Sequence, residues 1–370
     1  MPEISLKKNI IVVSVVPQKM TDEEAFKDLQ ELKQLIDAFD GKVVDYVIQK
    51  RDPHDQGLFI GKGKIEEVGA LLIEKQVDII VLNGIVNPSG IFFMKSTWEK
   101  IKPKIEVWDR AELIINIFSK HAKTAEAKLQ IELATMRHMG PRIYGMGYVL
   151  SRQAGSIGTR GIGETNTELM KRHWRDQIRG VNEKLYKLTD ERYKQLERRR
   201  KIGLKTISLI GYTNAGKTSL FNLLTGKKKL VQNALFVTLD SNVGKIYSNK
   251  LKQEILVTDT IGFIKNLPAK LISAFKSTLM ESMHADILLE VIDISDSEIE
   301  QKIAVVENIL KELNILDKKR IFIFNKIDQS DQFMNQELID KYKHFNPQFI
   351  SVKNQQGIEG LLNTIDDQLS

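Results

Sequence analysis

Apolar and polar residues follow two alternating patterns over the first 121 residues. Short apolar runs, such as residues 10–16, predict buried strands, whereas longer stretches with an apolar residue at every third or fourth position predict amphipathic helices. The first such stretch follows Thr21, which together with Glu24 has the sequence pattern of a helix capping box. Alternation of strands and helices is typical of a largely parallel sheet with helices on both faces, so we expect an N-terminal α/β domain over residues 1–121.

The strand pattern disappears between residues 122 and 204. Residues 124–139 repeat apolar positions on one helical face, the glycine-rich stretch 140–164 predicts a loop, and residues 166–200 predict one long helix. Over residues 171–205, thirteen Lys or Arg stand against five Asp or Glu, a net charge of +8, whereas the whole chain carries +7. This concentration of charge predicts a helical arm that contacts a polyanion, and a solvated basic surface is the alternative interpretation.

The composition excludes several other kinds of protein. There is no cysteine among the 370 residues, so disulfides and thiolate zinc sites are excluded, which fits a reducing compartment. The apolar run after Lys8 lacks a small-residue cleavage site and leads into a charged helix, so we interpret it as a buried strand rather than a signal peptide. No apolar run approaches the ~20 residues that a membrane span needs.

A phosphate-binding motif opens the third region, residues 205–370, where strands and helices alternate again. "GYTNAGKT", residues 211–218, matches G-x-x-x-x-G-K-[ST] and lies between a predicted strand and a predicted helix, as the motif requires. Backbone N–H groups of such a P-loop surround phosphates, and the helix dipole adds positive potential. We expect Lys217 to contact the β- and γ-phosphates and Thr218 to ligate Mg²⁺.

Two further motifs lie at the ends of predicted strands. Asp259 ends an apolar run, so a parallel sheet would place it beside the P-loop, where we expect it to hold Mg²⁺ mainly through water. Gly262 has no Cβ to keep its N–H away from a γ-phosphate. Asn325, Lys326 and Asp328 form the pattern N-K-x-D, whose carboxylate can accept two hydrogen bonds from guanine; adenine has no matching donors.

Thr238 and Ser351 are the weaker candidates. Thr238 lies between the P-loop and Asp259 in "LFVTLD", where it is expected to cover Mg²⁺ and the γ-phosphate, and "FISVK" resembles the loop that brackets guanine from the far side. The predicted catalytic residues are Lys217, Thr238 and Gly262, and the predicted metal ligands are Thr218, Thr238 and Asp259. The full set of predicted nucleotide contacts is Gly211, Tyr212, Thr213, Asn214, Ala215, Gly216, Lys217, Thr218, Ser219, Phe236, Val237, Thr238, Asp259, Thr260, Ile261, Gly262, Asn325, Lys326, Ile327, Asp328, Ser351, Val352 and Lys353.

Phe263 occupies the position after the switch glycine, where many GTPases have a glutamine that orients the attacking water. A phenyl ring cannot orient water by hydrogen bonding, so we expect slow intrinsic hydrolysis that a partner completes in trans. A packing role for Phe263 fits the sequence equally well. Asn214, inside the P-loop, predicts that K⁺ beside the phosphates stimulates hydrolysis.

Together these motifs resemble a translation-factor-type GTPase domain, and the chain resembles the HflX family from about residue 43 to 360. The resemblance is carried by "DTIGFIKNLP" in the GTPase region and, outside it, by "LFIGKGKIEEV", "AKLQIELATMRHMGPRI" and "GSIGTRGIGET". It implies a cytoplasmic, Mg²⁺-dependent GTPase that binds GTP and GDP, docks on the large ribosomal subunit and its rRNA, and splits or recycles stalled ribosomes. It also implies that Gly155–Gly163 approaches the peptidyl transferase centre. Some relatives are reported to bind ATP in the N-terminal domain. The glycines and lysines of "GKGK", residues 61–64, are the candidate phosphate contacts there, and a tight strand-to-helix turn explains them equally well.

The chain departs from the family pattern at "RQAGS", Ile162, Val237 and Val352, and it ends after the last predicted GTPase helix, where some relatives carry a further domain. The alternative function is that of an RNA-binding ribosome-assembly GTPase or scaffold, with GTP as an occupancy signal. We expect a monomer without a DNA partner or a membrane span. We expect it in the cytoplasm and partly at the ribosome or a membrane surface.

Overall fold

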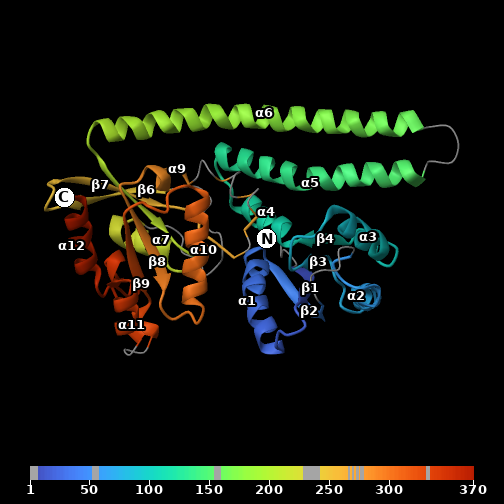
Figure 1. Cartoon of the computed structure of the whole chain (residues 1–370), viewed down its shortest axis with the longest axis horizontal. Coiled ribbons are helices and arrows are strands. Elements are labelled where there is room, and N and C mark those ends of the chain that lie inside the picture. Colours follow the sequence, from blue (N-terminus) through green and yellow to red (C-terminus); the bar gives the residue numbers. More distant parts are fainter. Residues whose placement is uncertain are drawn as a thin grey trace, which may run out of the picture. The chain divides into compact units, whose positions relative to one another are not determined.

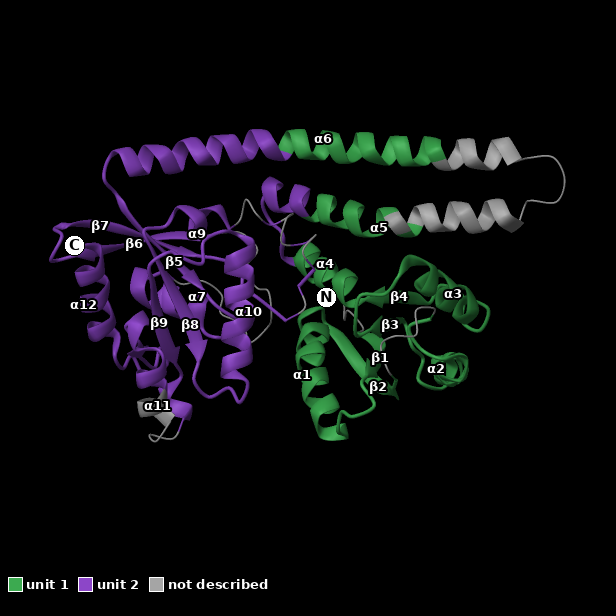
Figure 2. Cartoon of the chain, viewed as in Figure 1, with its two compact units in different colours: residues 1–120, 131–184 green, residues 121–130, 185–370 purple. Residues whose placement is uncertain are grey.

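The computed structural model describes residues 7–51, 58–153, 160–227, 242–265, 267–268, 271, 275, 279–330 and 334–370, without the side chains of 141, 143–153, 160–167 and 334–337. The chain divides into two compact units (Figure 2): unit 1 is residues 1–120 with 131–184, and unit 2 is residues 121–130 with 185–370. The division passes through the two long helices, so the predicted arm over residues 122–204 contributes to both units. The predicted domain boundaries at residues 121 and 204 stay predictions.

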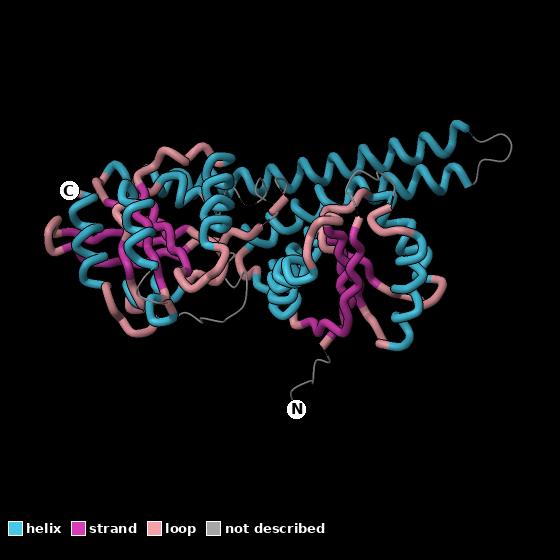
Figure 3. Tube along the Cα trace, turned by 60° about the horizontal axis from the view of Figure 1, so that its bottom comes forward, coloured by secondary structure: helices cyan, strands magenta, loops and turns pink. Residues whose placement is uncertain are grey.

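Unit 1 contains a four-stranded parallel sheet in the order β2-β1-β3-β4. Its strands are β1 (Lys8–Val16), β2 (Gly41–Lys50), β3 (Ile79–Leu82) and β4 (Glu106–Asp109), and its helices are α1 (Asp22–Ala38), α2 (Lys62–Glu74), α3 (Pro88–Glu99) and α4 (Arg110–His121). Leu72 of α2 and Trp98 of α3 belong to the same buried core as Ile11 and Val13 of β1. Helices flank both sides of the sheet (Figure 3), so the predicted α/β class is confirmed. The capping box predicted at Thr21 is present.

The helices α5 (Ala125–Gln153) and α6 (Arg160–Lys201) follow (Figure 1) and correct the prediction of a loop over residues 140–164. Residues 140–153 and 160–164 are helical, and residues 154–159 lie outside the described part of the chain. The indole Nε1 of Trp174 in α6 donates to the carbonyl of Met136 in α5 at 2.9 Å, and a Cβ on Gly140 would lie 2.7 Å from that nitrogen. Gly140 therefore permits close packing of α5 and α6. This packing stabilises a helix that each glycine alone would weaken by about 1 kcal/mol.

A buried ionic network attaches α5 to α4 and the end of β4. Arg142 contacts both Asp109, at 2.7 Å, and Glu112, and His138 Nε2 lies 3.0 Å from Asp109 Oδ1. Burial would raise the pKa of Asp109, but the hydrogen bond to His138 and the charges of His138 and Arg142 lower it. Burial raises the pKa of Glu112. Because Arg142 occupies both carboxylates, we interpret this group of acids with His138 as an ionic network rather than a metal site.

Unit 2 contains a six-stranded sheet in the order β10-β9-β8-β5-β7-β6, parallel except for β6. The strands are β5 (Lys205–Ile210), β6 (Asn242–Ser248), β7 (Gln253–Asp259), β8 (Ile287–Asp293), β9 (Arg320–Asn325) and β10 (Gln348–Phe349). The helices are α7 (Lys217–Thr225), α9 (Met280–His284), α10 (Ile299–Glu312), α11 (Met334–Lys341) and α12 (Ile358–Leu369), with short 3₁₀ turns η1 (Ile327–Gln329) and η2 (Lys343–Phe345). Helices α7 and α12 pack with one buried cluster of the sheet, and α10 and α11 pack with another. No helix in the described part of the chain is long and apolar enough to cross a membrane.

The C-terminal end of α6 joins β5 through a Schellman motif. Gly203 adopts a φ of +73°, its N–H donates to the carbonyl of Arg200, and the N–H of Leu204 donates to the carbonyl of Arg199. Within unit 2, Arg192 lies 3.1 Å from Glu126 and 3.4 Å from Glu281. The joint between the basic helix and the sheet is therefore a defined turn, and partly buried ion pairs stabilise the helix beside it.

Candidate functional site

The P-loop lies between β5 and α7, at the carboxyl end of the sheet. Gly211 and Gly216 have φ values of +136° and +99°. A Cβ on Gly211 would lie 2.3 Å from the Val291 carbonyl, and one on Gly216 would lie 2.3 Å from Asn325 Nδ2. Both glycines of the motif are thus required by backbone conformation and by close neighbours, before any ligand is considered.

Lys217 is buried at the start of α7. Its Nζ donates to the carbonyls of Gly211 at 3.1 Å and Tyr212 at 2.7 Å. Burial lowers the pKa of Lys217 to about 8, and the charge of Asp259 opposes this shift. The ammonium therefore lies inside the phosphate loop and is held there by neutral carbonyls, which a phosphate oxygen can replace as a stronger, charged acceptor.

Thr218 and Asp259 bring two oxygen groups together beside the loop. Thr218 Oγ1 donates to Asp259 Oδ2 at 3.0 Å, and Asp259 is fully buried at the end of β7. A hydroxyl and a carboxylate are hard oxygen ligands of the kind that Mg²⁺ takes in nucleotide sites. The residues present therefore fit a magnesium ion, with Thr218 and Asp259 as the groups that would hold it.

The segment after Asp259 is tied to the P-loop by its backbone. The N–H of Phe263 donates to the Gly211 carbonyl at 3.1 Å, and the N–H of Thr213 donates to the Phe263 carbonyl at 2.8 Å. A Cβ on Gly262 would lie 2.9 Å from Lys217 Nζ, so this glycine permits a close approach to the phosphate loop. The Phe263 ring is 1% exposed. Its burial supports the packing role for Phe263. Because the ring is apolar and buried, no side chain at this position orients the attacking water.

The predicted base-reading loop follows β9. Asn325 is buried and bridges two loops: its Nδ2 donates to the Ala215 carbonyl at 2.9 Å, and its Oδ1 accepts from the Val352 N–H at 3.1 Å. Lys326, with a φ of +69°, forms an ion pair of 2.5 Å with Asp293. One side chain thus connects the phosphate loop to the predicted guanine loops.

Asp328 is exposed at the turn after β9, and Ser351 holds its carboxylate. Ser351 Oγ donates to Asp328 Oδ1 at 2.6 Å and accepts from the Asn354 N–H at 3.1 Å. This hydrogen bond from Ser351 is the main cause that lowers the pKa of Asp328, with nearby Lys353 and Lys326 adding to it. The carboxylate is therefore ionised at neutral pH and oriented for a base with two donors.

The other predicted site residues fall into three groups. Ser219 lies in the first turn of α7, and Thr260 and Ile261 are buried, with Thr260 Oγ1 donating to the Leu209 carbonyl at 2.7 Å. Asn214 and Lys353 are exposed at the loop surfaces. Phe236, Val237 and Thr238 lie outside the described residues.

Two contacts of the site were absent from the sequence prediction, which did not name Asp293 and named Tyr212 only as a nucleotide contact. Asp293 binds Lys326, and Tyr212 Oη accepts from the N–H of Lys265 at 2.7 Å. Asp293 ends an apolar run at the carboxyl end of β8, as Asp259 does for β7, so the same sequence signal could have found it. The role of Tyr212 depends on the fold of the loop and has no local signal.

The "GKGK" stretch, residues 61–64, begins α2: Gly61 is the N-cap, and residues 62–64 form the first turn of the helix. The N–H of Gly61 donates to Gln49 Oε1 at 2.8 Å, and Lys64 pairs with Glu67 at 2.7 Å. These contacts account for the glycine and the second lysine without a nucleotide.

Models of protein families match three consecutive stretches of the chain. They are described as GTP-binding GTPase N-terminal, over residues 27–119, GTP-binding GTPase Middle Region, over residues 121–199, and 50S ribosome-binding GTPase, over residues 206–326. The chain is 38% identical over 369 residues to GTPase HflX of Caldanaerobacter subterraneus subsp. tengcongensis, which covers 100% of this chain and 82% of that protein. It is 32% identical over 350 residues to GTPase HflX of Escherichia coli K12, covering 95% and 81%. A solved structure described as the SsGBP and GDP complex has a similar fold over 98% of both chains, with a TM-score of 0.55 and 24% identity.

A parallel sheet that gathers these loops at its carboxyl edge has the architecture of a P-loop GTPase, and the model matched over residues 206–326 agrees. The identity to full-length relatives extends the assignment along the whole chain. The chain belongs to the HflX family of GTPases, and it is a GTP-binding and GTP-hydrolysing enzyme.

Proposed function

We propose that this GTPase docks on the large ribosomal subunit and uses GTP to split or recycle stalled ribosomes. The observation that carries the proposal is the direct connection between the nucleotide-binding sheet and a long basic helix, made by the capped turn at Gly203. Basic residues along α6 are exposed, including Arg175, Arg179, Lys184, Lys187, Arg198 and Lys201. Exposed cations of this kind bind nucleic-acid phosphates by releasing counterions. The description of the matched GTPase model as 50S ribosome-binding supports the large subunit as the partner.

In this proposal Lys217 binds the β- and γ-phosphates, Thr218 and Asp259 hold Mg²⁺, and Asp328 reads guanine. Mg²⁺, when bound, neutralises charge on the phosphates. The backbone hydrogen bond between Phe263 and Gly211 couples the segment after Gly262 to the P-loop. We propose that γ-phosphate binding at the P-loop changes the conformation of this segment through that hydrogen bond. Thr238 completes the proposed set of γ-phosphate sensors.

Sedimentation tests the proposed splitting against the scaffold alternative. Intact ribosomes are mixed with the protein and a non-hydrolysable GTP analogue and separated on a sucrose gradient, with GDP as the control nucleotide. We expect free subunits with the analogue, because the GTP-bound state is proposed to oppose subunit joining. Intact ribosomes that carry bound protein would instead support an assembly factor or scaffold.

Asn214 predicts that K⁺ stimulates hydrolysis at least several-fold over Na⁺ at equal ionic strength. Asn214 is exposed in the P-loop with a φ of +62°, so its amide oxygen is available to a cation beside the phosphates. Such a cation would neutralise charge that develops during transfer, as an arginine finger does. The matched variant is Asn214→Gly, which removes the amide and tolerates the left-handed backbone. Equal turnover in KCl and NaCl for the parent protein would contradict the prediction.

A further inference from the structure

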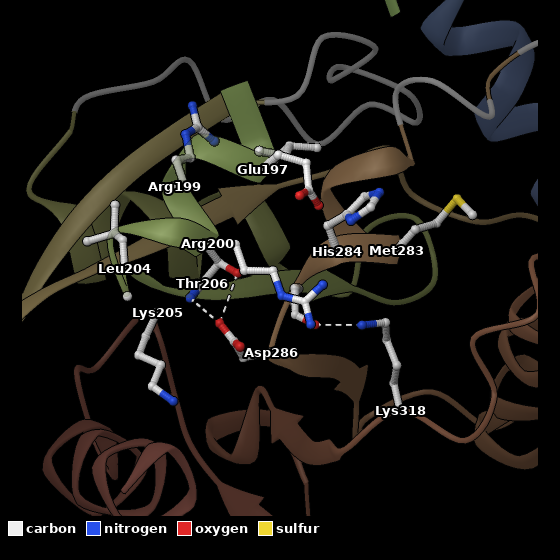
Figure 4. Close-up of a pocket in the computed structure, with 13 residues that line it drawn as sticks. Glu197, Arg199, Arg200, Leu204, Lys205, Thr206, Met283, His284, Asp286 and Lys318 are labelled. Carbon is white, nitrogen blue, oxygen red and sulfur yellow. Dashed lines mark hydrogen bonds between the residues drawn. The ribbon is translucent and has the colours of Figure 1, made fainter. Parts of the chain in front are cut away.

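A cavity lies in unit 2 beside the amino ends of β5, β8 and β9, whereas the P-loop follows the carboxyl end of β5. Its volume is about 450 Å³, and its charged and polar lining includes Glu197, Arg200, Thr206, His284, Asp286 and Lys318 (Figure 4). Leu196, Leu204 and Met283 contribute apolar walls. A volume of several hundred Å³ with mixed walls falls in the range of small-molecule sites.

The cations of this cavity exceed its acids. Arg199, Arg200, Lys205 and Lys318 line it together with the acids Glu197 and Asp286. Arg199 is engaged with Glu281 at 3.4 Å, and Asp286 Oδ2 accepts from the N–H of Thr206 at 2.7 Å and from its hydroxyl at 3.1 Å. The remaining positive charge favours an anion.

Arg200 is the cation best placed to receive that anion. Its guanidinium makes no hydrogen bond or ion pair with any residue that the structure describes, although it lines the cavity (Figure 4). Its own carbonyl is already capped by Gly203, so the side chain is not needed to close the helix end. Lys318 faces the same space and donates to the Ala285 carbonyl at 2.7 Å, which leaves further donors on its ammonium.

The pKa of His284 depends on the charged residues that line this cavity. Burial lowers the pKa of His284, and the charges of Lys318 and Arg200 lower it further, against the raising effects of Glu197 and Glu281. The ring also packs edge-on against Tyr193, with 5.4 Å between ring centroids. Arg200, Lys318 and His284 all line this one cavity, so a ligand there could contact all three.

We propose that this cavity binds a small phosphorylated molecule, with the phosphate between Arg200 and Lys318 and the apolar or ring portion against Leu204 and Met283. A guanidinium and an ammonium are the usual pair of phosphate partners in proteins. A recessed cavity with apolar walls fits a small molecule better than the backbone of an RNA, which an open basic surface would suit. Arg200 belongs to α6, and Lys318 and His284 belong to the sheet side of the joint. A bound ligand would therefore contact both the basic helix α6 and the amino edge of the GTPase sheet, which is the edge opposite the P-loop.

The test uses the full chain with its P-loop filled by saturating Mg²⁺ and GDP, and AMP and inorganic pyrophosphate as probes. Binding is measured by calorimetry, and the titration of His284 is followed by NMR with and without probe. We expect AMP to bind and to raise the pKa of His284, because a phosphate offsets the two cations. Arg200→Ala should weaken binding at least tenfold, since it removes a charged hydrogen bond, and Lys318→Met should have a similar effect.

Lys201→Ala is the matched control, because it removes the same charge from a neighbouring exposed residue that does not line the cavity. It should leave AMP binding and the His284 titration unchanged. Thermal unfolding of each variant checks that the fold is intact. Absence of AMP and pyrophosphate binding at millimolar concentration, or equal losses in Arg200→Ala and Lys201→Ala, would overturn the proposal. A short single-stranded RNA that binds while both small probes fail would also overturn it and would assign the face to RNA instead.

Discussion

Replacing Asp328 with asparagine should weaken GTP binding by roughly 10²–10³-fold while leaving the fold intact. Ser351 fixes one carboxylate oxygen at 2.6 Å, so the substitution turns the other oxygen of the pair into an amide donor that faces the donors of guanine. A site built to pair polar groups discriminates strongly against a mismatch, because the groups are left unpaired. Xanthosine triphosphate, which carries an oxygen in place of the guanine amino group, should bind the variant better than it binds the parent. Fluorescent nucleotide titration measures all three affinities.

Two further variants make this experiment specific. Asp317→Asn makes the same chemical change at an exposed position of unit 2 outside the site, and it should not alter GTP affinity. Ser351→Ala keeps the carboxylate but removes its holding hydrogen bond, so we expect a smaller loss, about tenfold. The lowered pKa of Asp328 keeps it ionised on acidification, so GTP affinity should stay flat from neutral pH down to the ordinary range of aspartate. Equal binding of ATP and GTP by the parent would refute the proposed base-reading role.

GTP turnover should be slow for the protein alone and should rise by ~10³–10⁵-fold on purified large ribosomal subunits, the range seen when a partner completes a GTPase site. Phe263 is buried and its backbone is paired with the P-loop, so no side chain at this position orients water. We therefore expect the ribosome to supply the missing group. Stimulation should fall as salt rises, because docking through exposed cations releases counterions.

Charge removal on α6 tests the docking step separately from chemistry. Arg198→Ala and Lys187→Ala each remove an exposed charge, whereas Arg199 is left in place because it binds Glu281. Each variant should weaken ribosome stimulation and should lower the slope of the salt dependence by about one for each rRNA phosphate that the protein no longer binds. Intrinsic turnover should not change, and Lys311→Ala, on the exposed side of α10, should leave both rates unaffected. Fast turnover of the protein alone, indifferent to ribosomes, would contradict the mechanism.

The sequence predicted the α/β class and the P-loop, Asp-x-x-Gly and N-K-x-D motifs because each is local and lies at the end of a strand. The carboxyl ends of β5, β7 and β9 lie at one edge of a mostly parallel sheet, so the three motifs that follow these strands lie close together. The long helix over residues 166–200 was predicted and lies within α6. The continuation of α5 past residue 139 could not be predicted, because the packing at Gly140 involves Trp174, 34 positions away in the sequence. Phe263 illustrates a different limit. An apolar residue at a catalytic position is compatible with either role until its burial is known.

The bridge made by Asn325 has a further consequence for the kinetics of nucleotide exchange. The Asn325 amide hydrogen-bonds both to Ala215 in the P-loop and to Val352 in the predicted guanine loop. This one buried side chain therefore holds the phosphate-binding loop and the base-binding loop at a fixed separation. The entropy of ordering these loops is lost when the chain folds, and an incoming nucleotide does not have to supply it. Association at this part of the site is then a docking onto a preformed surface. We therefore expect differences between GTP and GDP in residence time to arise where the third phosphate is proposed to lie, at Lys217 and Gly262, and not at the guanine.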